Sequence, residues 1–395
     1  MGISIGLVGL GAFGSSFAPL FKNHPLVDRI ALCDREPERV ARFANDPDFR
    51  DKLKPGDIYG SFDEILLSDL DALVIMTQPW LHAEQAIRAM EHGKHVYSAV
   101  PVVRVPDVDE ILGWCDRLIR TCEKTGMKYM LGETTVFRPQ TMFCRKMAKE
   151  GKFGEFVYSE GEYIHPYDAP YADLRVVKTR RESSSSGKEW LKYKKRYKKE
   201  GILDSPMTYP THSVSGPMSI MGAHALKVSA YGFISKNPDS YFEDFVFSNV
   251  TALFEMSNGT TMRICEYRDV AYPMGDIFEN EIMRVFGTMG SFRENRWATK
   301  TKWRELSVEE MREPLPEEVI MALKGEDQDK YVYGGHGGSH VYLVHEFVEA
   351  IAGERQPLVN AWEAVRYMAA GVAAHKSALR NGDIVEVTDW GDAPG

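Results

Sequence analysis

The start of the chain constrains the fold most, because an apolar run opens there into a glycine-rich turn. Ile3–Val8 has the pattern of a buried strand, and it is followed by Gly9 to Gly14 and then by a helical pattern. This is G-x-G-x-x-G in the strand–turn–helix context that dinucleotide binding requires. The first glycine permits the tight turn, the second lets a pyrophosphate approach the backbone, and the third lets the helix pack close to the strand. The residues expected to contact a dinucleotide here are Gly9, Gly11, Ala12, Phe13 and Gly14.

A second strand-like run, Ile30–Cys33, ends in Asp34, about 20 residues after Gly14, where the fingerprint places an acid. A carboxylate at this position accepts hydrogen bonds from the adenosine ribose hydroxyls and repels a 2′-phosphate. NAD is therefore expected as the cofactor, and NADP is disfavoured. Arg35 can stack on the adenine or meet such a phosphate. The alternative is a doubly wound domain that has lost its cofactor.

The composition excludes several classes of partner. At 395 residues the chain is too long for one ordinary core, so two domains are expected. A formal net charge of −9 argues against a nucleic-acid partner, and no apolar run approaches the length of a membrane span. The five cysteines show no metal-ligand spacing, and no cationic leader precedes the first strand. We therefore expect a cytoplasmic protein with reduced thiols, without a metal site and without a membrane partner.

The order of strand and helix signals predicts an α/β architecture in two parts. Over residues 1–135 strands and helices alternate, which is typical of a Rossmann domain with a doubly wound parallel sheet. Asn258-Gly259 favours a hairpin turn in the second part. The strand-like runs there, at antiparallel spacing, are Phe153–Tyr163, Ala225–Ile234, Phe245–Phe254, Thr260–Tyr267 and Ile282–Gly287. Residues 136–395 are expected to form an α+β domain with a large open, mainly antiparallel sheet, whose helices at about 341–380 pack back toward the first domain.

One low-complexity segment stands apart from this pattern. Ser183–Gly187 is a serine run, and Lys188–Lys199 interleaves basic and aromatic residues. Such interleaving occurs in proteins that bind single-stranded nucleic acid. In an acidic chain, a mobile loop followed by a solvated helix is the better interpretation. Its position before the catalytic-looking segment suggests a cover for the site.

Motifs over nearly the whole chain point to one family. The matching stretches are Leu70–Pro79, His82, Gly93–Val96, Gly132-Glu133, Arg138-Pro139 and Lys152–Phe156. Together they resemble the Gfo/Idh/MocA family of oxidoreductases. The resemblance implies a small carbohydrate substrate and a homodimer or homotetramer. It also implies further contacts to NAD, from Thr77, Gln78, Pro79, His82, Val100 and Pro101.

The sequence departs from the usual family pattern at two places that matter for the chemistry. The common Glu-Lys-Pro is here Ala99-Val100-Pro101, so the lysine that usually touches the nicotinamide and the substrate hydroxyl is missing. The common Asp-x-x-x-His is here Thr208 to His212, so the histidine is kept without its aspartate, and Ser215 stands where a further aspartate is common. The residue set of ordinary Lys-Asp-His polyol dehydrogenation is therefore incomplete.

These departures resemble one branch, the NAD-dependent α-N-acetylgalactosaminidases and allied glycosidases. The shared segments are Val100-Pro101, Tyr163–His165, Tyr209–His212 and Gly335–Gly338. The resemblance implies tightly held NAD, transient oxidation of the sugar at C3, elimination of the aglycone, addition of water and reduction of the ketone.

Hydride transfer at a sugar needs a base for the hydroxyl proton. His212 is the best candidate because an imidazole titrates near neutral pH; the alternative is a buried histidine hydrogen-bonded behind the sheet. Tyr163 can act as acid or base if a neighbouring cation lowers its pKa, or it packs on the sheet. His165 shares its strand face. Glu133 follows a strand end, where it binds substrate or caps a helix.

The main hypothesis is an NAD-dependent enzyme that transfers a hydride at a secondary alcohol of a sugar, glycoside or cyclic polyol. The first alternative is a redox-neutral glycosidase or lyase that uses the same hydride step. The second, which the missing lysine motivates, is a non-catalytic sugar sensor. His336 and His340 flank a glycine loop that can approach a ligand, or they are surface residues, and the histidine spacings match no metal-ligand pattern.

Overall fold

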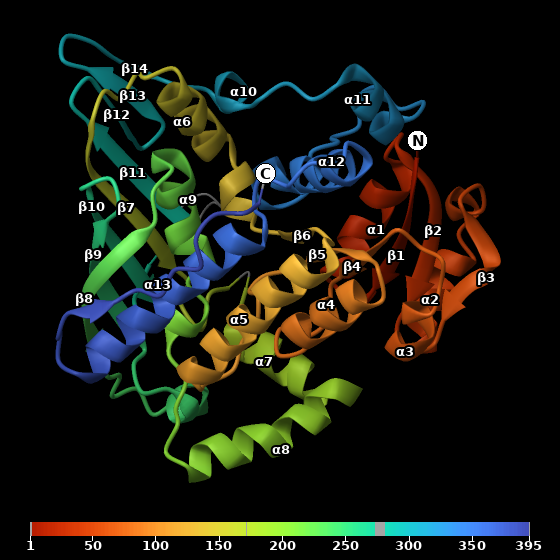
Figure 1. Ribbon diagram of the computed structural model, residues 1–395, viewed down its shortest axis with the longest axis horizontal. Helices are drawn as coiled ribbons and strands as arrows, with labels where there is room; N and C mark the ends of the chain where they lie inside the picture. Colours follow the sequence, from red (N-terminus) through yellow and green to blue (C-terminus); the bar gives the residue numbers. More distant parts are fainter. Residues whose placement is uncertain (1, 171, 273–280, 395) are drawn as a thin grey trace.

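The computed structural model describes residues 2–170, 172–272 and 281–394. It contains a six-stranded sheet, built from the N-terminal part of the chain, and a nine-stranded sheet (Figure 1). The predicted fold class is confirmed: a parallel Rossmann sheet is followed by a mixed, mostly antiparallel one.

The first sheet consists of β1 (Ile3–Val8), β2 (Val27–Cys33), β3 (Leu53–Tyr59), β4 (Ala72–Ile75), β5 (His95–Ser98) and β6 (Tyr129–Leu131). The order is β3-β2-β1-β4-β5-β6, and every pair is parallel. The helices between these strands are α1 (Gly14–Asn23), α2 (Pro37–Ala44), α3 (Phe62–Leu66), α4 (His82–Glu91) and α5 (Val108–Thr125). Parallel strands end at one edge, so this edge receives Gly9, Asp34, Thr77, Val100 and Glu133, where ligands of such sheets bind.

The strand β3 is not evident from the sequence pattern. It contains Lys54-Pro55-Gly56 and pairs only with β2, at the edge of the sheet. An edge strand has one unpaired side and tolerates proline, so it needs no continuous apolar run.

The second sheet consists of β7 (Phe156–Ile164), β8 (Ala225–Phe233), β9 (Asn249–Met256), β10 (Thr261–Tyr267), β11 (Glu281–Gly287), β12 (Gly290–Arg293), β13 (Arg296–Thr299), β14 (Trp303–Glu305) and β15 (Val385–Glu386). Its order is β14-β13-β12-β11-β7-β10-β9-β8-β15. The predicted hairpin at Asn258-Gly259 joins β9 to β10, and Gly259 has a φ of 80°. One pair, β7 with β10, is parallel, contrary to the expected antiparallel spacing. Hairpin spacing constrains only consecutive strands, and a long crossover separates these two.

Helices cover the sheets and connect the two parts of the chain. They are α6 (Pro139–Lys149), α9 (Thr211–Met221), α10 (Val308–Met311), α11 (Glu317–Lys324), α12 (Ser339–Ala352) and α13 (Ala361–Leu379). The C-terminal helices return to the first sheet, since α12 contacts α1 and β1, and α13 contacts both α5 and β8 (Figure 1). One continuous apolar core extends through both parts as a result.

The serine-rich segment is helical, which corrects the expectation of a mobile loop. It joins two helices, α7 (Leu174–Ser183) and α8 (Ser185–Lys199), which form a hairpin at the bottom of Figure 1. Ser184 caps α8, because its hydroxyl accepts a hydrogen bond from the Gly187 amide at 3.1 Å. Serine has a modest propensity for helix interiors but is strongly favoured as an N-cap, and this explains the error. The Trp190 ring stacks on Trp80 at 5.1 Å, which docks α8 on the first domain.

No helix among the described residues is long and apolar enough to cross a membrane.

The outer face of the second sheet carries exposed apolar side chains. Tyr231 is 66% exposed, Phe233 55% and Leu253 51%, and the strand register places all three on one face of β8 and β9. Exposed apolar patches of this kind mark protein interaction sites.

We therefore expect copies of this chain to associate through this face. Leu253→Glu should prevent that association, because a charge buried between two apolar faces loses its hydration. Light scattering on the eluting protein measures the mass, and Leu67→Glu, at a position 80% exposed on the first domain, is the control. Wild-type protein that is already monomeric would contradict this expectation.

Candidate functional site

The glycine turn after β1 forms the floor of a pocket of about 110 Å³, which also includes Asp34 and residues after β4. Gly9 has a φ of 90°, a conformation that favours glycine. A Cβ on Gly14 would lie 1.9 Å from the Gly9 carbonyl oxygen, so the helix start packs directly on the turn. A Cβ on Gly11 would meet only the Arg39 guanidinium, at 3.9 Å, so this backbone is open to a ligand. These features fit the backbone approach of a dinucleotide pyrophosphate.

Asp34 both faces this pocket and organises its turn. Its carboxylate accepts hydrogen bonds from the amides of Leu10 (2.7 Å) and Glu36 (2.9 Å). Only 8% of Asp34 is exposed, and Arg39 lies 3.5 Å away. Arg35 is exposed and pairs with Glu189 of α8 at 3.4 Å.

The other residues expected to contact the cofactor fall into two groups. Thr77 and Gln78 line the same pocket as the glycine turn, whereas Ala12 is exposed beside it. His82 is buried, and its ring nitrogens lie 2.9 Å from the Pro101 carbonyl and 3.2 Å from the Thr77 carbonyl. Burial lowers the pKa of His82 to about 4, so the ring is neutral. His82 therefore positions the loop after β4 against the segment that contains Val100 and Pro101, while Pro79 borders a different pocket.

The candidate catalytic residues meet where the two parts of the chain touch. Glu133 follows β6, and His212 lies in the first turn of α9. The Nδ1 atom of His212 is 2.8 Å from Glu133 Oε1, and its Nε2 atom is 3.0 Å from the Tyr209 hydroxyl. Glu133 also caps the turn that follows it, through the Thr135 amide at 2.9 Å. The structure thus brings together a carboxylate, an imidazole and a phenol in one chain of hydrogen bonds.

The protonation of His212 differs from that of an ordinary imidazole. Burial alone would lower its pKa, but the Glu133 carboxylate raises it to about 9. Although burial works against it, the pKa of Glu133 is lowered by His212. At neutral pH the pair is therefore ionised, and His212 holds a proton. His212 can act as a base only after it has given up this proton. The ordinary pKa of an imidazole, on which the sequence prediction rested, does not indicate this.

Tyr163 and His165 share a strand face, as predicted, and form a second group beside this chain. The Tyr163 ring lies 4.9 Å from the His212 ring. The His165 Nε2 atom faces the Ala172 carbonyl at 2.9 Å, so Nδ1 accepts the Tyr163 hydroxyl at 2.7 Å. A cation is present, since the Arg268 guanidinium lies 4.7 Å from the Tyr163 ring, yet burial raises the pKa of Tyr163. Burial lowers the pKa of His165 to about 4.

Close packing of α9 on β7 explains why these groups meet. A Cβ on Gly161 would lie 1.9 Å from the Ser213 carbonyl oxygen, so only glycine allows this approach. The sequence analysis missed Glu266, which accepts a hydrogen bond from the Ser213 hydroxyl at 2.6 Å and pairs with Arg268 at 2.7 Å. The sequence signal that could have identified Glu266 is a glutamate among the apolar residues of β10. Burial raises its pKa to about 7.

The glycine loop with two histidines lies over the fingerprint. The Phe13 ring contacts His336 at 5.9 Å and His340 at 5.7 Å, and His340 is 4.3 Å from the Phe17 ring. His340 is buried, so it is not a surface residue. Burial lowers the pKa of His336 to about 4. Across the described part of the chain, no group of three or more His, Cys, Asp or Glu side chains has the arrangement of a metal site.

Both parts of the chain match known proteins. Residues 3–133 match a model described as an oxidoreductase family with an NAD-binding Rossmann fold, and residues 145–387 match the C-terminal alpha/beta domain of the same family. A glycosyl hydrolase family 109 protein from Bacteroides fragilis is 37% identical over 169 residues, which are 41% of this chain and 35% of that protein. One from Bacteroides thetaiotaomicron is 28% identical over 292 residues, 66% of this chain and 55% of that protein. The matches thus span about half or less of these relatives.

Solved structures share the fold. The scyllo-inositol dehydrogenase from Lactobacillus casei, crystallised with NAD(H) and scyllo-inositol, matches with a TM-score of 0.64 and 18% identity. The match covers 98% of this chain and 99% of that one.

Asp34 is expected to set the choice between NAD and NADP. Asp34→Ala removes the carboxylate that would repel a 2′-phosphate, so the preference for NAD should narrow. Calorimetric titration with each dinucleotide measures this preference. Asp34→Asn, which keeps a side-chain oxygen for the Leu10 amide, separates the charge from the role of Asp34 in the turn. Tighter binding of NADP than of NAD by the wild type would contradict the assignment.

The charge state of His212 should depend on Glu133. We expect His212 to titrate near pH 9 in the wild type and at a clearly lower pH in Glu133→Gln, because the effect of burial is then opposed chiefly by Glu281. NMR of the imidazole nitrogens measures both values. The pKa of His212 is higher in the folded protein than in the unfolded chain. The stability that His212 contributes is therefore fully present below pH 6.5 and is lost as the pH rises through 9. The free energy of unfolding of the wild type should fall over this range by up to about 3 kcal/mol more than that of the variant. Equal pH profiles would contradict the assigned ion pair.

Proposed function

Because this chain belongs to the Gfo/Idh/MocA family of oxidoreductases, we propose that it transfers a hydride between NAD and a secondary alcohol carbon of a sugar, glycoside or cyclic polyol. The first domain supplies an NAD-binding Rossmann fold, and the open turn at Gly11 fits the pyrophosphate. When bound, NAD supplies the hydride acceptor and donor. Gly9, Gly11, Asp34, Thr77 and Gln78 would hold it.

The observation that carries this proposal is the hydrogen-bonded chain of Tyr209, His212 and Glu133 beside the expected cofactor edge. With both ring nitrogens protonated, His212 donates one hydrogen bond to Glu133 and one to the Tyr209 oxygen. The Tyr209 hydroxyl proton is then available to a substrate oxygen. Proton transfer to a developing alkoxide, or from an alcohol in the reverse direction, would pass along this chain and would not need the missing lysine.

A second candidate is a redox-neutral glycosidase that uses the same hydride step twice. Two observations favour it. Relatives that match along the sequence carry the name glycosyl hydrolase family 109, and Val100 occupies the position of the usual lysine. Tyr163, against the His212 ring, would remove the C2 proton after oxidation at C3 while its own hydroxyl proton passes to His165 Nδ1, to which it is hydrogen-bonded.

One experiment separates these activities. After mass spectrometry has identified the cofactor that the protein carries, the protein is incubated in D₂O with a panel of glycosides, once without and once with added NAD. Free sugar with deuterium at C2 and no net NADH would support the glycosidase. An oxidised sugar that appears only with added NAD would support a dehydrogenase. If neither product forms with a broad panel of sugars and polyols, hydride transfer is contradicted. The non-catalytic sugar sensor is then the remaining hypothesis.

Turnover should depend most strongly on His212. His212→Asn keeps a polar side chain of similar size but cannot hold or pass a proton, so turnover should fall by roughly 10²–10⁴-fold. NAD affinity should be nearly unchanged, because the glycine turn lies in the other domain. Tyr163→Phe is the comparison: an equal loss would make Tyr163 the residue that exchanges the proton with substrate and His212 its partner. Near-normal turnover of His212→Asn with a verified substrate would contradict the assignment.

A further inference from the structure

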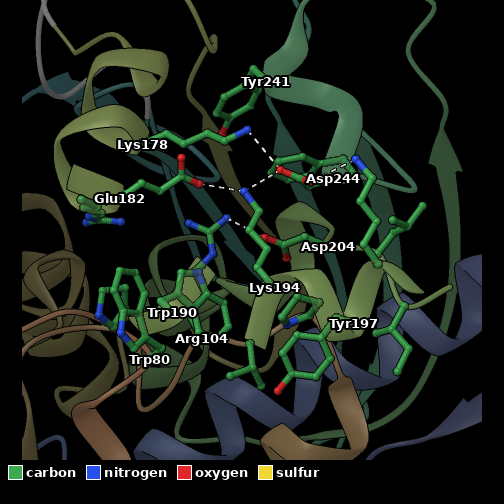
Figure 2. Close-up of a pocket in the computed structure, with 18 of the residues that line it drawn as sticks. Trp80, Arg104, Lys178, Glu182, Trp190, Lys194, Tyr197, Asp204, Tyr241 and Asp244 are labelled. Carbon is green, nitrogen blue, oxygen red and sulfur yellow. Dashed lines mark hydrogen bonds and ion pairs between the residues drawn. The ribbon is translucent and has the colours of Figure 1, made fainter. Parts of the chain in front are cut away.

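A second pocket, here called the hairpin pocket, lies between the α7–α8 hairpin and the first domain. It has a volume of about 130 Å³, and its wall includes Trp80, Arg104, Trp190 and Tyr241 (Figure 2). Arg181 also lines it. Neither His212 nor the glycine turn lines it, so it is separate from both the catalytic chain and the cofactor pocket.

The charges around the hairpin pocket do not balance. Arg104 pairs with Asp204 at 3.1 Å, and Asp244 pairs with Lys178 at 3.1 Å and Lys194 at 2.6 Å (Figure 2). Further along the wall, Glu182 also pairs with Lys194, at 2.8 Å, and Lys198 lies 3.7 Å from Asp244. Every acid on the wall therefore already has a basic partner.

Arg181 is the cation without a counterion. It lines the hairpin pocket, but within the described residues its guanidinium forms no hydrogen bond and no ion pair. Burial, and then the charge of Arg104, lowers its pKa. Arg181 is partly buried, so its guanidinium is only partly hydrated, and a second cation beside it favours the binding of an anion. Its neighbour Arg180, by contrast, is exposed to solvent.

The hairpin pocket is also apolar and close to the catalytic chain. The parallel rings of Trp80 and Trp190 form one side, 5.1 Å apart, with apolar side chains such as Val105 and Phe245 elsewhere on the wall. The Arg104 guanidinium lies 5.9 Å from the Tyr209 ring, and Tyr209 bonds to His212. A group held in the pocket is thus one side chain away from the proposed reaction centre.

We infer that the hairpin pocket binds an anionic group, a carboxylate or a sulfate, attached to an apolar or aromatic part of the substrate on its leaving-group side, with Arg181 as the anion's partner. The substrate named here rests on the second candidate function, the glycosidase, whereas the binding of an anion at Arg181 does not depend on it. A guanidinium matches the geometry of both anions and stays charged in a partly buried site. The cofactor pyrophosphate does not explain Arg181, because this residue does not line the glycine-turn pocket.

Binding can be tested without turnover. The probes are 2-naphthoate and naphthalene-2-sulfonate, with the uncharged 2-naphthamide as the matched control, titrated into the NAD-loaded protein. The Trp80–Trp190 pair should report binding as a change in tryptophan fluorescence, and calorimetry measures the affinity. In Arg181→Ala the affinity for the preferred anion should fall about tenfold or more, while the amide is unaffected. Arg180→Ala, which removes an exposed cation one residue away on the same helix, should change the anion affinity much less than Arg181→Ala does.

Several results would overturn the inference. They are equal binding of the amide and both anions, no binding of either anion, or an equal loss in Arg180→Ala. A loss of NAD affinity in Arg181→Ala without a loss of anion affinity would assign the residue to the cofactor instead.

Turnover adds a second readout. A 2-carboxy-4-nitrophenyl glycoside should have a higher kcat/KM than the 4-nitrophenyl glycoside. Arg181→Ala should abolish this difference by raising the KM of the carboxylated glycoside. If neither glycoside is turned over but the anions bind through Arg181, the glycosidase proposal fails and this site stands. If both are turned over equally and no anion binds, the proposed function stands and this site fails.

Discussion

The ion pair of Glu133 with His212 is the interaction on which the arrangement of the whole site depends. Glu133 lies two residues after β6 of the parallel sheet, and His212 lies in the helix that packs on the other sheet, so their 2.8 Å contact joins the two halves. Glu133 is fully buried and His212 is 8% exposed. Losing one partner of such a pair costs about 3–5 kcal/mol, because the other charge is left buried and unpaired. The proposed proton transfer and the relative placement of the two domains therefore depend on the same contact.

The rest of the fold keeps that contact in place. The C-terminal helix α13 packs against α5 of the first domain and β8 of the second, and α12 packs on α1. On the other side, Gly161 lets the backbone of α9 touch β7, which sets Tyr163 against the His212 ring. The two sheets are thus fixed from both ends of the chain. The candidate catalytic groups therefore come together without a flexible loop.

The sequence predicted the parts of this site that local pattern controls. The glycine turn and Asp34 follow from spacing along the chain, and the strand period places Tyr163 and His165 on one face. It did not predict the charge on His212, because that depends on a carboxylate 79 residues away in the chain. Nor did it find Glu266, whose partner Ser213 comes from another element. The prediction of a loop at the serine run was wrong for a related reason. Ser184 stabilises the start of α8 through a capping hydrogen bond, which composition does not show.

The missing lysine has a physical consequence that links these observations. A lysine at position 100 would place a fixed cation beside the substrate. In its absence, the positive charge nearest to Tyr209 within the hydrogen-bonded chain is the imidazolium of His212, which exists because Glu133 holds its pKa at about 9. Arg104 and Arg181 add charge from the other side and favour the ionised form of Tyr209, although burial still keeps its pKa well above the ordinary value. The phenol is therefore a proton donor held between cations. Such a phenol can donate a hydrogen bond to a negatively charged substrate oxygen and so stabilise it, while the phenol itself stays neutral.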